Sequence, residues 1–428
     1  MDNLIYDLYK SYGQYCNWRT LPSLMDGLKP VERRVLLSAY QIARNKLTKS
    51  AKIEGYCISK YHPHGSIYMT LVQLVHQGFV IGQGNWGDDE DKPAAMRYTE
   101  ARLNPAIEKL VFELLDYVPW ETIDLDKEPI YLPTMYPLCL LGNTHTIGIG
   151  FGYRAFIPLY KIEDLYKRLL YLIGERKRKP IIKPVTDCNI VSSDKDIENL
   201  LLTGKEIIKV RGIYEINEKE HSVILRSWPP GKKIEALVGK FDEELSQGDI
   251  GYSDFGGSEK EYCFKVLKQR NRSDILNKFV KKLDEVVTGQ ISFDTVVIDE
   301  KGKVQRTSID QLLLNSFNNY ISLSKKMLEC EKIRYDNILF EFNVLEKIRP
   351  YLSKHIKKAV ENYDETIKKI SKDSKIAENI IKLLFSKYKI NKLLTMKLEK
   401  DEIENKIKYF DNELKDVKKY VLNKYEGE

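Results

Sequence analysis

The sequence predicts an α+β protein of several domains, and three features of the chain indicate this. Residues 1–158 hold most of the Pro and His residues and several short helical patterns. Residues 159–310 mix short alternating runs with helical ones. From residue 311 onward there is no Gly until Gly427 and a single proline, Pro350, which indicates long helices. With 428 residues and 43% apolar composition, the chain is too long for one ordinary domain.

The first region predicts a helix-turn-helix followed by a wing. Pro30 suits the first turn of a helix, whose apolar stripe comprises Val31, Val35, Leu36, Ala39, Ile42 and Ala43. A second helix is expected over Lys52–Ser59, and a third after Gly65. The tight HPHG turn between these two gives the helix-turn-helix. The Gly-rich run Phe79–Gly87 is strand-like, as a wing would be.

The middle and the tail predict different architectures. Alternation predicts paired strands at Glu206–Ile216 and Ser222–Arg226, further strands at Tyr262–Leu267 and Val296–Asp299, and a helix over Ile234–Leu245. A long helix is expected from Ile309 to about Glu346, and a returning helix from about Asp401 to Tyr420. This pairing favours an antiparallel coiled coil with a small head over a plain helical bundle.

Composition excludes several classes of protein. Net charge is +7, with 31% charged residues of mixed sign, so clustering of charge matters more than its total. Six scattered cysteines without a CxxC pair fit a reducing cytoplasm and argue against a zinc site. The chain starts without a signal-like segment and has no apolar stretch that could span a bilayer, so we expect a cytoplasmic protein with no membrane association. No Gly-rich motif for ATP is present.

The strongest chemical signal combines GQGNWG (Gly82–Gly87) with AAMRYTEARL (Ala94–Leu103). An exposed Tyr98 on a loop beyond a Gly-rich wing can attack a phosphodiester. A phenol has an ordinary pKa near 10, so it needs a base or nearby cations. Arg97 can bind two phosphate oxygens and stabilise the transition state. The link that forms conserves the energy of the broken bond, so resealing needs no fuel.

Two further motifs can hold phosphates. In KYHPHG, His62 and His64 are fixed by the intervening proline and can donate to phosphate or move protons; the alternative is a His-rich turn with satisfied ring nitrogens. In DGLKPVERR, a basic edge suits phosphate contacts, and the alternative is a solvated charged face. Its cations are Lys29, Arg33 and Arg34. The run DDED (Asp88–Asp91) is interpreted as a solvated acidic run, so no metal ligand is assigned in this chain.

These motifs resemble, in order and approximate spacing, the A subunits of DNA gyrase and topoisomerase IV, the DNA-cleaving subunits of type IIA topoisomerases. The matching segments are RTLPSLMDGLKPVERRVL, KYHPHG, GQGNWG and AAMRYTEARL, with weaker similarity continuing through LLGNTHTIGIGFGYRAFIP to YKINKLLTMKLEKDEIENK. The resemblance implies a winged-helix DNA breakage-reunion domain over residues 1–158 and a tower domain over 159–310. It implies a coiled coil with a helical C-gate dimerisation region over 311–428.

The resemblance also implies roles for individual residues. Tyr98 matches the catalytic tyrosine and Arg97 its neighbour, and Ile147 matches the isoleucine that wedges between base pairs and bends DNA. Active-site or DNA-backbone contacts are implied for Arg19, Lys29, Arg33, Arg34, Lys60, His62 and His64. In the C-gate, Leu393, Leu394, Met396 and Leu398 would supply apolar groups for homodimer formation.

The implied enzyme is an ATP-hydrolysing type II topoisomerase. Tyr98 would form a transient 5′-phosphotyrosine link while a second duplex passes through the double-strand break, relaxing and decatenating DNA. Mg²⁺ and ATP would both be bound by a partner subunit, in a heterotetramer of two plus two.

The sequence also departs from the family pattern. Glu32 stands where the family has His, and Met69 stands at an acidic position on the helix where quinolones bind, which leaves drug sensitivity open. The segment matching the C-gate is followed only by a helix of mixed charge, as in short phage enzymes. No β-pinwheel for wrapping DNA follows it, so negative supercoiling is not expected.

Two other functions remain open at this point. A non-cleaving DNA-binding or architectural protein could use the same fold, although the Arg97–Tyr98 pair favours cleavage. A tyrosine enzyme that nicks one strand would not need the C-gate-like tail.

Overall fold

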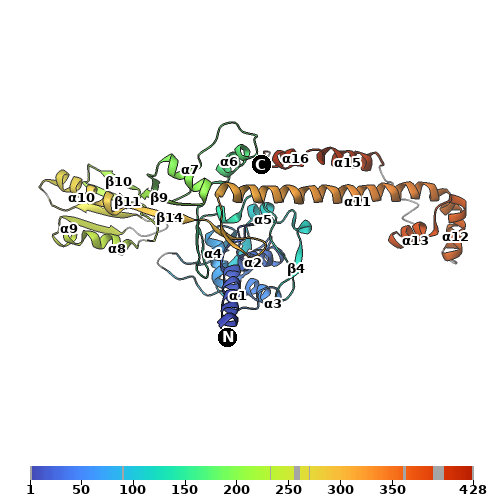
Figure 1. The fold of residues 1–428 in the computed structure, drawn as a ribbon, viewed down its shortest axis with the longest axis horizontal. Helices are drawn as coiled ribbons and strands as arrows, with labels where there is room; N and C mark the ends of the chain where they lie inside the picture. The colour runs from blue at the N-terminus through green and yellow to red at the C-terminus, as the bar shows by residue number, and fades with distance from the viewer. Residues whose placement is uncertain are drawn as a thin grey trace. The chain divides into compact units, whose positions relative to one another are not determined.

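A computed structural model describes residues 2–88, 91–231, 233–254, 261–268, 270–359, 363–388 and 400–426 (Figure 1). The chain divides into two units, Met1–Tyr320 and Ile321–Glu428. The strands of the described residues all lie in the first unit, and the second unit is helical there. The prediction of an α+β protein is therefore confirmed at the level of its overall composition of helices and sheets.

The first unit begins with four helices and a small sheet. Their bounds are α1 Asp2–Thr20, α2 Pro30–Ile42, β1 Thr48–Lys49, α3 Ser50–Lys60, α4 Tyr68–His76, β2 Val80–Gln83 and β3 Glu100–Leu103. Helix α2 packs against α3 and α4, and β3 lies between β1 and β2 with antiparallel pairing on both sides. The two predicted helices on either side of the HPHG turn are confirmed.

The burial of α2 explains why this segment is a helix. Pro30 occupies its first turn, where the absent N–H would have no helical partner. Val35, Leu36 and Ala39 are fully buried, as the predicted apolar stripe requires. The helix also buries Arg33 and Arg34, which the stripe did not predict.

A hairpin and a larger sheet follow. The elements are α5 Pro105–Val111, η1 Leu115–Tyr117, β4 Trp120–Thr122, β5 Lys127–Pro129, η2 Leu138–Leu140, β6 Thr146–Ile149, β7 Arg154–Ile157, α6 Ile162–Leu172, β8 Asn189–Ile190, α7 Asp194–Thr203, β9 Lys205–Arg211 and β14 Thr288–Asp294. The sheet has the order β6-β7-β14-β9-β8. Strands from before and after residue 158 thus share one sheet.

A second sheet has the order β10-β11-β13-β12 and is covered by helices. Its elements are β10 Tyr214–Asn217, β11 Ser222–Leu225, α8 Ile234–Val238, η3 Gly239–Phe241, α9 Asp242–Ser246, β12 Ile250–Asp254, β13 Tyr262–Val266 and α10 Arg272–Val286. Two predictions are corrected here. The run Glu206–Ile216 is not one strand, because it divides into β9 and β10 in different sheets. The helix expected over Ile234–Leu245 is broken by the 3₁₀ turn η3 at Gly239.

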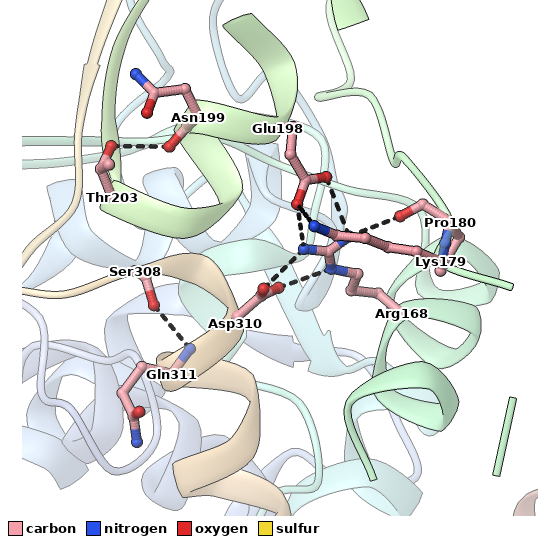
Figure 2. Close-up of polar contacts among 9 residues, drawn as sticks. All are labelled: Arg168, Lys179, Pro180, Glu198, Asn199, Thr203, Ser308, Asp310 and Gln311. Atoms are coloured by element: carbon pink, nitrogen blue, oxygen red, sulfur yellow. Dashed lines mark hydrogen bonds and ion pairs between the residues drawn. The ribbon is translucent and has the colours of Figure 1, made fainter. Parts of the chain in front are cut away.

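One buried arginine joins three helices of the first unit (Figure 2). Arg168 of α6 has no exposed surface, and its Nε and Nη2 lie 2.8 and 2.7 Å from the carboxylate oxygens of Asp310. Its Nη1 and Nη2 contact the Glu198 carboxylate at 3.2 and 3.1 Å, and Lys179 pairs with the same group. Nη1 also donates to the Pro180 carbonyl at 2.8 Å. Arg168 therefore ties α6 to α7 and to the first turn of the long helix α11, Ile309–Ala359.

The first unit ends with the hairpin β15 Val296–Ile298 and β16 Val304–Arg306 and with the start of α11. The second unit contains the rest of α11, α12 Tyr363–Ser374, α13 Glu378–Lys387, α15 Lys400–Glu413 and α16 Val417–Glu426. An apolar cluster joins α11 to α12 and α13; it comprises Val344, Leu345, Ile348, Leu352, Ile367, Ile370, Ile381, Leu384 and Phe385.

Helix α15 contacts α11 through the rings of Phe410 and Tyr335, whose centroids are 5.6 Å apart, and through Lys332 and Asp411. Two expectations about the tail are corrected: α11 continues through Pro350, and the last predicted helix is interrupted between α15 and α16. The predicted gate residues Leu393, Leu394, Met396 and Leu398 lie outside the described residues.

Candidate functional site

Tyr98 lies in a tight turn just before β3, and its side chain is open to solvent. Its backbone N–H donates to the Ala95 carbonyl at 2.8 Å, and 65% of the residue is exposed. The guanidinium carbon of Arg97 lies 4.6 Å from the centre of the Tyr98 ring. The turn therefore presents a phenol and a cation side by side, as the sequence motif predicted.

The residue after Tyr98 anchors this turn. Thr99 has no exposed surface, its Oγ1 lies 2.8 Å from the hydroxyl of Ser50, and its carbonyl accepts from the Ser50 N–H at 3.1 Å. The hydroxyl of Tyr68 lies 3.0 Å from the same Oγ1 and donates to the Ala94 carbonyl at 2.6 Å. Helices α3 and α4 thus hold both sides of the turn that exposes the tyrosine.

The Gly-rich run before the turn is required by close packing. A Cβ at Gly82 would collide with the indole of Trp86, and Gly84 adopts a φ of +108°, which L side chains rarely adopt. The Trp86 carbonyl accepts a hydrogen bond from His76 Nε2 at 3.0 Å. These contacts explain why glycines are spaced as they are in GQGNWG.

The HPHG turn places His62 against Arg34. His62 is 8% exposed, and its Nδ1 lies 3.1 Å from Arg34 Nη1. A guanidinium can only donate, so Nδ1 accepts and the neutral ring carries its hydrogen on Nε2. Burial lowers the pKa of His62 to about 4, and the positive charges of Arg34, His64 and Arg19 add to this effect. The imidazole is therefore neutral at ordinary pH.

Arg34 itself is buried in a cluster of carboxylates. It is 2% exposed, its Nε lies 2.8 Å from Glu128 Oε2, and its Nη2 lies 2.6 Å from Glu128 Oε1. Nη2 is also 2.7 Å from Asp124 Oδ2. Burial alone would lower the pKa of Arg34, but these two carboxylates raise it above its usual value.

His64 and Arg19 complete this cluster. The Nε2 of His64 lies 3.4 Å from Asp124 Oδ2, and its ring meets that of His62 edge-on at 5.3 Å. Burial alone would raise the pKa of Asp124. The hydrogen bond to Arg34 and the nearby His64 outweigh this effect and hold the pKa of the carboxyl below its usual value. Arg19, in the last turn of α1, is half-buried with its guanidinium 5.5 Å from the Tyr15 ring.

The predicted basic edge on α2 is not open in the structure. Arg33 makes a two-point pair with Asp26, at 2.7 and 3.1 Å, and is 6% exposed. Arg33 and Arg34 are therefore neither an open edge nor a solvated face. Lys29 is more accessible, and its Nζ lies 3.4 Å from Glu32, whose carboxylate also accepts from the Lys29 backbone N–H at 2.9 Å. Glu32 thus caps α2.

Lys60 and Ile147 are exposed, as the predicted contacts require. The Lys60 side chain is 43% exposed and its Nζ is 3.9 Å from Asp126. Ile147 is 44% exposed on β6, opposite Phe156 of β7. The tip of this hairpin is fixed to α1, because the Asn17 carboxamide oxygen accepts from the Phe151 N–H at 2.6 Å.

Six of the ten predicted residues lie in two groups, and Lys29, Arg33, Lys60 and Ile147 lie in neither. Arg19, Arg34, His62 and His64 come together with Asp124 and Glu128, whereas Arg97 and Tyr98 pair separately. Within the described residues, no hydrogen bond or ion pair joins these two groups. The carboxylates Asp26, Asp124 and Glu128 were missed, because the sequence did not indicate that Arg33 and Arg34 would be buried.

Across the ranges that the structure describes, there is no group of three or more His, Cys, Asp or Glu that could hold a metal ion. Asp88 of the acidic run accepts from the Asp91 N–H at 2.8 Å, a turn contact, and residues 89 and 90 lie outside the described part. None of the described helices is long and apolar enough to cross a membrane.

Comparison with known proteins gives consistent matches. The sequence profile of the family that comprises the A subunits of DNA gyrase and topoisomerase IV matches residues 19–426. The A subunit of DNA gyrase from Lawsonia intracellularis is 27% identical over 470 residues, covering 96% of this chain and 54% of the relative. The A subunit of DNA topoisomerase 4 from Pseudomonas aeruginosa is 28% identical over 338 residues, covering 71% of this chain and 44% of the relative. The chain spans about half the length of the curated relatives that it matches.

Proposed function

Since the chain belongs to the family of the DNA gyrase and topoisomerase IV A subunits, we propose that it is the DNA breakage-reunion subunit of a type IIA topoisomerase. The observation that carries this proposal is the turn at Tyr98. An exposed phenol lies beside the Arg97 guanidinium, and the buried Thr99 fixes the backbone next to it. A nucleophile must be accessible and held in place, and this turn meets both conditions.

The proposed chemistry is a reversible transesterification. The Tyr98 oxygen attacks a DNA phosphorus, the bond from phosphorus to the 3′ oxygen breaks, and the 5′ end becomes linked to the tyrosine. The phenolic proton leaves to solvent, and the departing 3′ oxygen takes up a proton in turn. Arg97 stabilises the charge on the phosphoryl oxygens. The reverse attack by the 3′ hydroxyl reseals the strand.

The other candidate residues would bind the DNA backbone. Lys60 and Arg19 keep accessible cationic groups and are proposed to contact phosphates directly. Lys29 is proposed to do so as well, although its ammonium group is paired with Glu32 and its side chain is 15% exposed. His62 and His64 would donate to phosphate oxygens as neutral or charged imidazoles. Arg33 and Arg34 have their donors engaged within the chain, so we assign them to holding this surface and adding positive potential beneath it.

The finer architecture belongs to the same proposal. Helices α3 and α4 with the β1-β3-β2 sheet would be a winged helix, and α11 with α15 an antiparallel coiled coil. The four-stranded sheet and the strands β8, β9 and β14 would belong to the tower over residues 159–310. Residues 388–406 would form the C-gate through which two copies dimerise. Ile147 would be the wedge that bends DNA.

The complete reaction also requires Mg²⁺ and ATP. We propose that Mg²⁺ and ATP are bound by a partner subunit in a two-plus-two heterotetramer, as membership of the family suggests. The assembled enzyme would relax supercoils and unlink catenated circles.

The test is a cleavage assay with a partner subunit, Mg²⁺ and supercoiled DNA, quenched with denaturant. We expect double-strand breaks with protein on the 5′ ends, and their loss in Tyr98→Phe with DNA binding retained. Tyr6→Phe is the matched control, because Tyr6 is 69% exposed and lies on α1. Nicks alone would indicate a single-strand enzyme. Intact DNA with undiminished binding would indicate the non-cleaving alternative.

A further inference from the structure

The donors of Arg34 are distributed among three partners. Nε and Nη2 bind the two oxygens of Glu128, and Nη2 also meets Asp124, so the guanidinium is held in one orientation. In that orientation Nη1 points to His62 Nδ1 at 3.1 Å. Glu128 lies on β5, 94 residues along the chain from Arg34. Its side chain is 4% exposed, whereas that of Asp124 is 24% exposed and is shared with His64.

We propose that Glu128 is a positioning residue of the cleavage site, which acts through Arg34 to keep His62 as the neutral tautomer with hydrogen on Nε2. The assignment of the tautomer depends only on the geometry of this chain. The use of His62 as a donor to DNA rests on the proposed function.

The tautomer of His62 follows from which of the two groups, the guanidinium or the imidazole, can donate a hydrogen bond. A hydrogen bond received at Nδ1 favours the neutral ring and excludes the tautomer with hydrogen on Nδ1. Within the described residues, Nε2 of His62 makes no hydrogen bond, so this N–H remains for an incoming acceptor such as a phosphate oxygen.

The charged groups that act on His62 come from four segments of the chain. They are Arg34 of α2, Arg19 of α1, His64 of its own turn and Asp124 of the β4–β5 connection. Three of these oppose a positive charge on the ring, and only Asp124 favours it. Without Glu128, the guanidinium would tilt toward Asp124 and release Nδ1, which removes one cause of the neutral state.

Nitrogen NMR of the histidine rings tests the proposal on the chain alone, without DNA or partner. The chain has six histidines, and His62→Gln identifies the signal of His62. We expect the wild-type ring to show hydrogen on Nε2 only and to stay neutral down to a pKa of about 4. In Glu128→Gln, we expect mixed tautomers and a pKa that shifts toward the ordinary value of about 6.5.

Glu121→Gln is the matched control. Glu121 is the cross-strand neighbour of Glu128 in the same hairpin, but it is exposed, so the same substitution there should leave His62 unchanged. Glu128→Asp keeps the charge and should restore the wild-type tautomer in part. An unchanged His62 spectrum and titration in folded Glu128→Gln would overturn the proposal.

A second variant decides the question if Glu128→Gln does not fold. Arg34→Lys keeps the charge but lacks the planar guanidinium with its several donors. A lysine at this position therefore cannot bind Glu128 and donate to His62 at the same time. We expect the same mixed tautomers, and a wild-type His62 spectrum in this variant would again overturn the proposal.

Cleavage provides a readout that separates the two proposals. With partner and Mg²⁺, Glu128→Gln should acquire an inflection in its pH–rate profile at the His62 pKa found by NMR, which wild type and Glu121→Gln lack. If Tyr98→Phe still cleaves, the proposed function fails while the NMR result stands. If the NMR shift is seen but the pH–rate profile keeps its wild-type form, Glu128 sets the tautomer without positioning a group for cleavage, and that part of the inference fails.

Discussion

Replacing Arg168 by Met should destabilise the first unit by several kilocalories per mole. Met keeps much of the buried apolar stem but removes the guanidinium that meets Asp310 and Glu198. Removing one partner of a buried ion pair costs about 3–5 kcal/mol. Glu198 retains Lys179, and its side chain is 18% exposed, so Asp310 accounts for most of the loss. We therefore expect a loss at the lower end of this range, about 3 kcal/mol, which corresponds to about 4–5 °C in melting temperature for a unit of this size.

The measurement is calorimetry of wild type and variant under identical buffer and protein concentration. Lys167→Met is the matched control, because Lys167 is the preceding residue of α6 and its exposed side chain pairs with Asp164 at 2.9 Å, one turn away. Such a pair contributes about 0.2–0.5 kcal/mol, so the control should melt within about 1 °C of wild type. Equal melting temperatures for the two variants would refute the structural role of Arg168. Arg168→Lys should lie between them, since a lysine cannot bind both carboxylates in two-point fashion.

Three other predictions concern DNA and pH. Ile147→Ala should reduce DNA bending, measured by end-to-end fluorescence transfer, more than it reduces affinity; Ile207→Ala, with a comparably exposed isoleucine on β9, should leave bending unchanged. DNA affinity should fall steeply with salt, and removing the charge of Lys60 or Arg19 should reduce the log–log slope by about 1 each, whereas a flat salt dependence would contradict the phosphate contacts. His62 has a folded pKa of about 4 and a usual value of 6.5, so the unfolded chain binds its proton first. Stability measured by urea denaturation should therefore decline as pH falls from about 6.5 to about 4, and less so in His62→Gln.

The motifs of the site could be predicted because each is contiguous in the sequence. The Gly-rich run, the arginine and the tyrosine lie within a short segment, and the structure places Arg97 and Tyr98 side by side in an exposed turn. Its anchor could not be predicted, because Ser50 and Tyr68 reach Thr99 from other elements. The contacts of a buried hydroxyl depend on packing that the local pattern does not contain.

The ion-pair partners of the basic residues of α2 could be predicted from the sequence even less well. A run of cations beside a proline indicates a helix start, but it does not reveal whether a carboxylate distant in the chain will neutralise it. Glu128 lies 94 residues from Arg34, and Asp310 lies 142 residues from Arg168. Both pairs are buried, and burial is decided by the assembled fold.

The errors in secondary structure have local causes. The run Glu206–Ile216 alternates like one strand, yet Gly212 and Ile213 separate β9 from β10. The N–H of Gly212 donates to Val287 at 2.9 Å, and a Cβ at Gly212 would collide with the Ser227 carbonyl. A close approach of this kind marks the place where the chain leaves one sheet for another.

The attachment of Tyr98 to β3 has a mechanical consequence for the proposed reaction. A DNA end joined to Tyr98 would be connected, through Thr99 alone, to a strand paired on both sides along β1 and β2. If tension on the DNA acts along β3 when the break opens, it would load the hydrogen bonds of both ladders in shear, all at once. The same force applied to a residue in a loop would break the hydrogen bonds of that loop one after another. The central position of β3 would therefore suit the proposed reaction, in which the linked DNA end must be held while the break is open.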